Sequence, residues 1–163
     1  MAKNDPLEDC ELKVSKINNG TVIDHILAGM ALIVLEMLGI TGREGTQVTL
    51  SLNVPSKKKT KKDIVKIETR FLDRREINQI ALISPNATIN EIRDFNVVNK
   101  FQVKLPEKIV GFPKCINPRC ITNAREPPKQ TYFVKTIEPL NVRCKYCNIS
   151  MNQQEIIKQL IKE

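Results

Sequence analysis

The sequence predicts an α+β protein, because segments with the two-residue period of strands alternate with segments that have a helical pattern. Two observations support this prediction. Before Leu105-Pro106 the expected order is strand, helix, strand, strand, helix, strand. This β-α-β-β-α-β order is typical of ferredoxin-like domains, in which two helices cover one face of an antiparallel sheet. After Leu105-Pro106 come short strands, prolines, cysteines and a final helix, which predicts a second, smaller domain.

A strand and a buried helix are predicted near the start of the chain. Glu11–Ile17 has the pattern of a strand. Thr21 or Asp24 is expected to cap a helix over "HILAGMALIVLEML", whose only acidic residue, Glu36, comes late, so the helix is expected to be buried nearly all round. Gly39 is expected to end it, because glycine readily adopts the left-handed conformation found after helices.

A hairpin of two strands is predicted next. In Gln47–Val54 apolar side chains alternate with polar ones, so one face of this strand is expected to be buried. Its partner is "DIVKIETRF", from Asp63 to Phe71. The loop between them contains "KKKTKK" (Lys57–Lys62), which taken alone is compatible with a solvated loop tip.

A second helix and one or two further strands complete the first unit. Asp73 and Glu76 have the spacing of a capping box, which predicts a helix that begins there and ends at Ser84-Pro85. "ATINEIRDFNVVNKFQVKL" supplies the remaining strands. We therefore expect domains over residues 1–105 and 106–163.

The second domain is expected to be a small antiparallel β domain with a C-terminal helix. Ser150 and Gln153 have capping-box spacing at the start of that helix. Its apolar stripe is formed by Ile156, Ile157, Leu160 and Ile161. A domain this short buries little surface and needs a covalent or metal cross-link.

Four cysteines in two close pairs can supply that cross-link. They are Cys115 and Cys120 in "CINPRC" and Cys144 and Cys147 in "CKYC". Two tight turns that each offer two thiolates are how tetrahedral zinc sites are built. Two disulfides or four unrelated cysteines are the alternatives. The N-terminal stretch lacks the apolar core of a secretion signal, and Cys10 leaves an odd number, so one structural Zn²⁺ per chain is favoured.

The expected metal site is structural rather than catalytic. Four sulfur ligands close the coordination sphere and leave no position for water. Four thiolates around Zn²⁺ carry a net charge of about −2. Cationic side chains beside the ligands are expected to offset it: Lys114, Arg119, Arg143 and Lys145.

The formal net charge of +8 favours polyanionic partners, which could be nucleic acid, phosphorylated metabolites or an acidic protein. No stretch has the length and apolarity of a membrane span; the nearest, Ile26–Leu38, is too short. The charged N-terminus is not a secretory signal. We therefore expect a cytoplasmic protein that does not bind a membrane.

Several stretches occur together in an order that resembles one family. They are "GTVIDHI", "NVPSKKKTKKDIVKIE", "ISPNATINEIRDFNVVNK", "LPEKI" and the paired cysteines. From about Leu12 to the C-terminus the chain resembles the regulatory chain of aspartate carbamoyltransferase. The resemblance implies a noncatalytic subunit that forms a homodimer and binds catalytic trimers through its zinc domain. The resulting dodecamer makes carbamoyl-aspartate for pyrimidine synthesis. The N-terminal domain of such chains binds CTP as inhibitor and ATP as activator.

The resemblance also implies a nucleotide site in the N-terminal domain. Asp24 would lie near the ribose and His25 near phosphate. Lysines would contact the triphosphate: Lys62, Lys66 and Lys100. Contacts around the base and sugar would come from Asn90, Ile92 and Val97. The implied site also includes Val14, Ser15, Lys16, Ile17 and Phe95. Among these, Ser15 and Lys16 replace a Glu-Ala pair, and Phe95 stands where a tyrosine is common. On a strand, Lys62 and Lys66 would share one side.

Of three functions that fit parts of the sequence, that of a regulatory subunit is favoured. A zinc-ribbon protein that binds nucleic acid would fit the charge and the cysteines, but its zinc segment has few aromatic residues for base stacking: Phe112, Tyr132, Phe133 and Tyr146. An enzyme that uses Asp24-His25 as acid and base would need a nucleophile motif and a third orienting group, which the sequence lacks. Neither enzymatic activity nor a nucleic-acid partner is expected.

Overall fold

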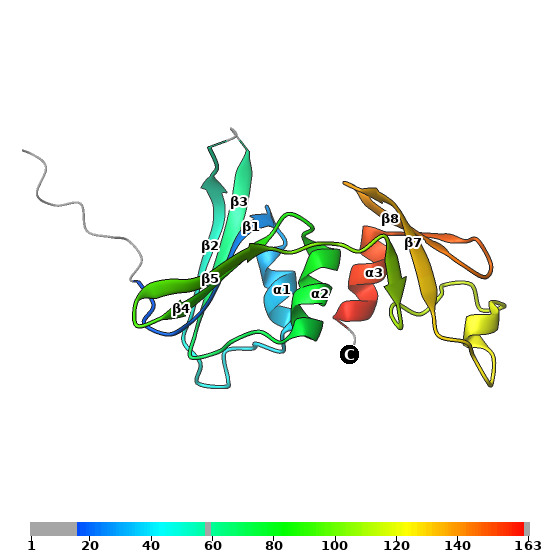
Figure 1. Cartoon of the computed structure of the whole chain (residues 1–163), viewed down its shortest axis with the longest axis horizontal. Coiled ribbons are helices and arrows are strands. Elements are labelled where there is room, and N and C mark those ends of the chain that lie inside the picture. Colours follow the sequence, from blue (N-terminus) through cyan, green and yellow to red (C-terminus); the bar gives the residue numbers. More distant parts are fainter. Residues whose placement is uncertain (1–15, 58–59, 162–163) are drawn as a thin grey trace, which may run out of the picture.

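The computed structural model describes residues 16–57 and 60–161, which form two antiparallel sheets with helices between them. Figure 1 shows α1 and α2 on one side of the N-terminal sheet and α3 between α2 and the C-terminal sheet. The protein is therefore of the α+β class, as predicted. Within the described residues, no helix is long and apolar enough to cross a membrane.

The N-terminal sheet has five strands in the order β2-β3-β1-β4-β5, and every neighbouring pair is antiparallel. Its elements are β1 (Gly20–Leu27), α1 (Ala31–Met37), β2 (Val48–Pro55), β3 (Lys61–Glu68), α2 (Arg74–Ile83), β4 (Thr88–Arg93) and β5 (Asn96–Gln102). The predicted order of elements is present, and the last segment supplies two strands.

The C-terminal sheet has four antiparallel strands in the order β6-β7-β8-β9. Its elements are β6 (Lys108–Val110), the 3₁₀ helix η1 (Ile121–Asn123), β7 (Thr131–Ile137), β8 (Leu140–Cys144), β9 (Ser150–Asn152) and α3 (Gln153–Leu160). The stretch from Gly111 to Gln130 contains no regular element apart from η1, so something other than backbone pairing must hold it.

The predicted start of the first helix is wrong. Residues 20–27 form the central strand β1, and α1 begins only at Ala31, with no side-chain cap at Met30. Neither Thr21 nor Asp24 is therefore an N-cap. The physical reason is that β1 is a central strand between β3 and β4. The short apolar run of such a buried strand cannot be distinguished from that of a buried helix by its periodicity. Of the predicted strand Glu11–Ile17, residues 11–15 lie outside the described part, and residues 16 and 17 belong to no strand.

A carboxylate from another strand fixes the start of α1. Asp63 of β3 is fully buried, and it accepts hydrogen bonds from the backbone N–H of Gly29 (2.8 Å) and Ala31 (3.3 Å). It also accepts one from the N–H of Asn53 (2.9 Å), where β2 has a bulge. This side chain joins α1, β2 and β3 at one point.

Three expected helix boundaries are confirmed. Asp73 and Glu76 form the capping box of α2, which ends at Ser84. Gly39 follows α1 with a φ of 68°, the left-handed conformation expected after a helix.

Two further details differ from the prediction. β2 has no cleanly buried face, and Leu52 is 45% exposed, because β2 is an edge strand with a bulge between Ser51 and Val54. The capping box of α3 is formed by Asn152 and Glu155 rather than Ser150 and Gln153. Ser150 is the first residue of β9 and pairs with Arg143 of β8, so the strand continues for two more residues before the helix can begin.

The buried core runs continuously from one sheet to the other. In the N-terminal unit it includes Ile23, Val65, Ile67, Ile80 and Ile89, and in the C-terminal unit Tyr132, Leu140, Val142, Met151 and Ile156. Polar contacts between described residues also cross the junction. The Gln153 amide donates to the Ile83 carbonyl (2.6 Å), and the Asn86 amide donates to the Glu138 carboxylate. The two units thus share both apolar and polar contacts.

Candidate metal centre and basic sheet face

The four cysteines predicted as ligands meet at one point. Their Sγ atoms all lie within 4.8 Å of one another. We call the two turns that carry the cysteine pairs knuckles, the first with Cys115 and Cys120 and the second with Cys144 and Cys147. The closest approaches join the two knuckles: Cys115 to Cys147 at 3.5 Å and Cys120 to Cys144 at 3.8 Å. A disulfide bond would be about 2.05 Å long, so the sulfurs are not bonded. Sulfurs at the corners of a tetrahedron with metal–sulfur bonds near 2.3 Å would be about 3.8 Å apart. The donor set therefore fits a tetrahedral metal ion.

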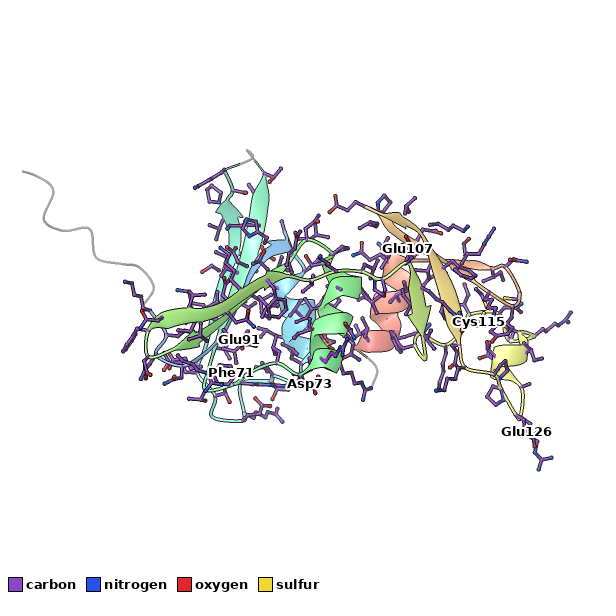
Figure 2. The ribbon with its side chains drawn as sticks, viewed as in Figure 1. Phe71, Asp73, Glu91, Glu107, Cys115 and Glu126 are labelled. Atoms are coloured by element: carbon purple, nitrogen blue, oxygen red, sulfur yellow. The ribbon has the colours of Figure 1, made fainter. Side chains whose placement is uncertain are left out.

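Each cysteine reaches the cluster from a different piece of local structure. Cys120 precedes η1, and Cys144 ends β8. The Asn123 side chain donates to the carbonyls of Cys115 and Asn117, at 2.8 Å each, which closes the first turn. Asn148, with a φ of 62°, turns the chain just after Cys147. Figure 2 shows Cys115 in the C-terminal unit, away from Phe71 and Asp73 of the N-terminal unit.

Burial and nearby hydrogen-bond donors act in opposite directions on the pKa values of the cysteine thiols. Burial raises the pKa of the Cys115 thiol to about 12, although an N–H from Asn117 acts in the opposite direction. Burial also raises the pKa of Cys144. At Cys147 burial acts upward too, but hydrogen bonds from the Ile149 N–H and from Cys115 outweigh it and lower the pKa to about 7. A bound cation would favour the thiolate form at every ligand.

The cations predicted beside the ligands have their side chains in solvent. The four residues are all exposed: Lys114, Arg119, Arg143 and Lys145. On the buried side of the cluster the donors are neutral, and the Thr122 hydroxyl donates to the Cys120 sulfur at 3.1 Å. The negative charge of a loaded centre would therefore be balanced by cations outside and by hydrogen bonds inside.

A second group of predicted residues lies on the N-terminal sheet. On β3, Lys66 alternates with the core residues Val65 and Ile67, so it points away from the face that α1 and α2 cover (Figure 1). Val22 of β1 pairs directly with Lys66 of β3 and with Asn90 of β4, and Asn90 pairs with Lys100 of β5. Directly paired residues of antiparallel strands point to the same face. Lys66, Val22, Asn90 and Lys100 thus form one row across four strands, and we call it the basic row.

Asp24 and Lys62 lie beside the basic row. The Lys62 ammonium is 2.7 Å from Asp24 Oδ1 and 3.0 Å from Oδ2. His25 lies at a bulge of β1 and has a φ of 57°. Its backbone N–H donates to the Asp24 carboxylate at 2.6 Å, and its ring Nδ1 lies 3.3 Å from the same carboxylate. Lys62 and Lys66 lie four residues apart on the regular strand β3 and are both half-buried. The Asp24 carboxylate therefore lies between the Lys62 ammonium and the His25 imidazole beside the basic row.

The far end of the same face is apolar. Ile92 pairs with Val97, and the β4–β5 turn presents Phe95, which is 61% exposed. Asp94 and Phe95 both have positive φ angles, 48° and 62°, a turn that usually takes Asn and Gly and is strained for phenylalanine. The Phe95 N–H donates to the Asn18 carbonyl at 3.0 Å, which holds the segment of Lys16 and Ile17 next to the turn.

The structure does not cover every predicted site residue. Val14 and Ser15 lie outside the described residues. Sequence reasoning missed two polar positions. Thr88 pairs with Asp24 across β1 and β4, and Asp63 occupies an inward position of β3. A signal for Asp63 was present, since an aspartate interrupts the apolar positions of "DIVKIE".

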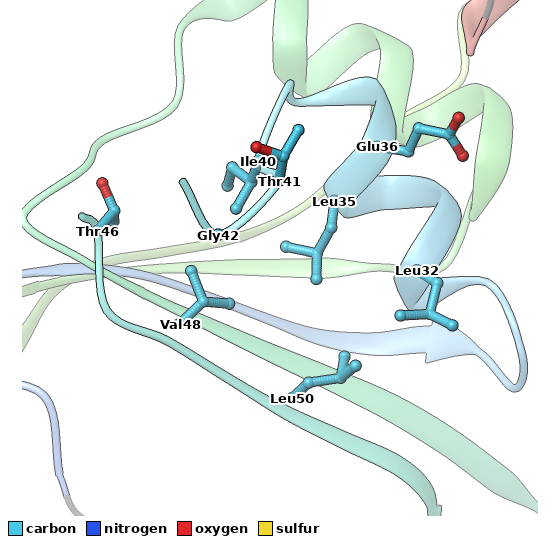
Figure 3. Close-up of a pocket in the computed structure, with 9 residues that line it drawn as sticks. All are labelled: Leu32, Leu35, Glu36, Ile40, Thr41, Gly42, Thr46, Val48 and Leu50. Atoms are coloured by element: carbon cyan, nitrogen blue, oxygen red, sulfur yellow. The ribbon is translucent and has the colours of Figure 1, made fainter. Parts of the chain in front are cut away.

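One hollow of the N-terminal unit is unsuited to a polyanion. Figure 3 shows it between α1 and β2, on the helix side of the sheet. Its lining is mainly apolar, and the only charged residue in it is the acidic Glu36. The lining residues are Leu32, Leu35, Glu36, Ile40, Thr41, Gly42, Thr46, Val48 and Leu50. The basic row, on the other face, has the charge that an anion requires.

The cluster of four thiols in one unit indicates a metal-binding protein, and the sheet face of the other unit carries several lysines. Two family models match the chain. The allosteric domain of the aspartate carbamoyltransferase regulatory chain matches residues 12–104, and its metal binding domain matches residues 107–157. The chain belongs to the family of aspartate carbamoyltransferase regulatory chains.

Relatives described as aspartate carbamoyltransferase regulatory chains support this assignment. The relative from Pyrococcus abyssi is 53% identical over 152 residues, which is 92% of this chain and 99% of the relative. Those from Thermofilum pendens and Saccharolobus solfataricus are each 50% identical over 151 residues, covering 92% and 93% of this chain and 95% of each relative. The alternative of a zinc-ribbon nucleic-acid-binding protein is not favoured by these findings.

Proposed function

We propose that this chain is a noncatalytic subunit that binds nucleoside triphosphates, CTP and ATP, on the basic row and transmits their effect to catalytic chains of aspartate carbamoyltransferase. The observation that carries the proposal is the alignment of Lys66, Asn90 and Lys100 across β3, β4 and β5, with Lys62 and Asp24 beside them. Three ammonium groups suit the charge of a triphosphate, and the Asp24 carboxylate can accept hydrogen bonds from ribose hydroxyls.

The nucleotide would extend along the face from its charged end to its apolar end. Phosphates at Lys62, Lys66 and Lys100 would leave the base near Ile92, Val97 and Phe95, with Lys16 and Ile17 alongside. The Lys62 ammonium lies 2.7 Å from the Asp24 carboxylate, so nucleotide binding would exchange part of that ion pair for contacts to phosphate and ribose. His25, half-exposed beside Asp24, would add a donor to phosphate.

We also propose how the two units divide the work. Residues 1–105 would form a ferredoxin-like nucleotide domain, since β3-β1-β4 with β2 outside matches that arrangement and β5 extends it. Residues 106–163 would form a domain that holds one structural Zn²⁺, because four thiolates suit this soft-to-borderline ion and leave no open position. The chain would form a homodimer and join catalytic trimers in a dodecamer of pyrimidine biosynthesis.

The surface of the metal domain supports a docking role. Exposed apolar side chains lie on the loops around the thiol cluster: Ile116, Ile121, Tyr146 and Ile149. Exposed cations lie among them, including Arg119 and Lys145. An apolar centre with a charged rim is typical of protein interfaces. We propose that the catalytic chain, with complementary acidic groups, covers this surface.

Lys100→Ala is expected to weaken CTP and ATP binding by roughly 10- to 100-fold, because one charge-assisted contact to phosphate contributes about 1.5–3 kcal/mol. Lys100 is exposed on β5, so the fold should tolerate the change. Isothermal titration of each nucleotide measures the effect. Lys104→Ala is the matched control, because this exposed lysine lies just beyond β5 and outside the basic row. Equal affinities for the two variants would rule out the proposed phosphate contact.

A further inference from the structure

Tyr132 places a hydroxyl group inside the metal domain, beside the thiol cluster. It lies on β7, where it pairs directly with Cys144 of β8 and with Ile109 of β6. Because directly paired residues of antiparallel strands point to the same face, its ring projects to the side of the sheet that bears Cys144. The residue is 0% exposed and is one of the largest side chains in the core.

The hydroxyl of Tyr132 has no hydrogen-bond partner. Within the described residues, it is the buried side-chain nitrogen or oxygen atom for which no partner is found. Leaving a buried polar group unpaired costs roughly 1–3 kcal/mol. Native proteins pair nearly all such groups, so an exception needs an explanation. A phenylalanine would fill the same space without this cost, and the hydroxyl must therefore gain a partner in some state of the protein.

The Cys115 sulfur is the acceptor that fits. Burial raises the pKa of the Tyr132 hydroxyl, and the nearby thiols of Cys115, Cys144 and Cys120 raise it further. Of the three, Cys115 is also placed as a partner for the hydroxyl, but the contact does not have the geometry of a hydrogen bond. A neutral thiol is only a weak acceptor. A thiolate carries a full charge, and hydrogen bonds to ionised groups are about twice as strong as neutral ones. The acceptor becomes strong only when the cysteine loses its proton.

We propose that Tyr132 donates a hydrogen bond to the Cys115 thiolate of the metal-loaded centre and thereby increases the affinity of the chain for metal. This inference rests on the proposed four-thiolate site. The proton that Cys115 loses on metal binding goes to solvent, and the phenol keeps its own. Metal ligands are commonly held and tuned by such outer hydrogen bonds.

The position of the other donors supports this role. The Thr122 hydroxyl already contacts the Cys120 sulfur at 3.1 Å, which shows that hydroxyl-to-sulfur contacts are part of the buried side of the cluster. The flanking cations are exposed, as described above, so they do not serve this side. Tyr132 would supply the matching hydroxyl for Cys115, the other cysteine of the same pair.

The test is Tyr132→Phe in the full-length chain. Its affinity for Zn²⁺, measured by competition with a chelator, is expected to fall about 10-fold or more, the usual effect of removing such a hydrogen bond. With Co²⁺ as a probe, the sulfur-to-cobalt charge-transfer bands should move to longer wavelength, because a sulfur without its hydrogen-bond donor holds its electrons less tightly. The band position reports this contact even if the variant is less stable.

Tyr146→Phe is the matched control. Its hydroxyl is in the second knuckle but faces the Lys129 carbonyl at 3.4 Å, so affinity and bands should stay as in the unmodified chain. Unchanged affinity and bands in Tyr132→Phe, with or without a gain in stability, would overturn the inference while leaving the metal site intact. An unmodified chain that binds neither Zn²⁺ nor Co²⁺ through four thiolates would overturn both proposals.

Discussion

Cys144→Ser is expected to lose the bound metal and to unfold the metal domain while the five-stranded sheet remains folded. Cys144 is fully buried at the end of β8, and its sulfur is 3.8 Å from that of Cys120. Because the position is buried, a water molecule from solvent cannot take the place of the missing sulfur as a metal ligand. The irregular stretch from Gly111 to Gln130 depends on this cluster for its cross-link. Binding of a structural Zn²⁺ to such small domains releases about 10–16 kcal/mol, which is folding free energy.

The result can be read with metal analysis and amide hydrogen exchange on the same sample. Amides of β7 and β8 should lose protection, whereas those of β1 and β3 should keep most of theirs, because the N-terminal sheet has its own core. Nucleotide binding should remain measurable. Cys10→Ser, which changes the fifth cysteine, should retain the metal. Retention of both metal and β8 protection in Cys144→Ser would contradict the account of this domain.

Asp63→Ala is expected to destabilise the N-terminal unit by about 3 kcal/mol or more. The carboxylate is the shared acceptor for the N–H groups of Gly29, Ala31 and Asn53. Its removal leaves three donors without a partner, and each unpaired buried donor costs about 1–3 kcal/mol. Alanine also leaves a cavity in a fully buried position.

Urea unfolding, followed by a probe in the N-terminal sheet, measures this effect. Asp73→Ala is a useful comparison, because it removes the capping box of α2 and should cost only about 0.5–2 kcal/mol. Asp94→Asn, in the exposed β4–β5 turn, should change little. A free energy of unfolding for Asp63→Ala within 0.5 kcal/mol of the unmodified chain, the usual range for surface substitutions, would show that the three hydrogen bonds contribute no net stability.

The contacts of Asp63 also explain why one part of the fold was mispredicted. The run from His25 to Leu38 is apolar enough to be read as one buried helix. What divides it into β1 and α1 is the pairing of β1 with β3 and β4, together with the carboxylate that binds Gly29 and Ala31. These partners come from distant parts of the chain, and local periodicity does not report them.

Features encoded by nearby residues were predictable. The capping box of Asp73 and Glu76 lies within one turn, and each knuckle brings two cysteines together by spacing alone. The capping box of α3 was misplaced by two residues, because the pairing of β9 with β8, rather than the box itself, decides where the helix begins.

The basic row was only half predictable. The common side of Lys62 and Lys66 follows from strand geometry. That Lys100 lies in the same row as Lys66 depends on the strand order β3-β1-β4-β5 and on the register of each pair, which the sequence alone does not reveal. The resemblance to a family indicated the residues, and the sheet gives the physical reason why they can act together.

The central claim is that this chain gives nucleotide control to catalytic chains that it binds through its metal domain. The most direct measurement mixes the full-length chain with catalytic chains from the same organism and follows carbamoyltransferase activity with CTP or ATP, while light scattering reports the mass of the assembly. We predict that the mixture forms a complex larger than the catalytic trimer and that its activity responds to nucleotides. Lys100→Ala should assemble but respond only at higher nucleotide concentration. The chain alone should have the mass of a dimer and no activity. A mixture that does not assemble, or an assembly whose activity ignores both nucleotides, would contradict the account.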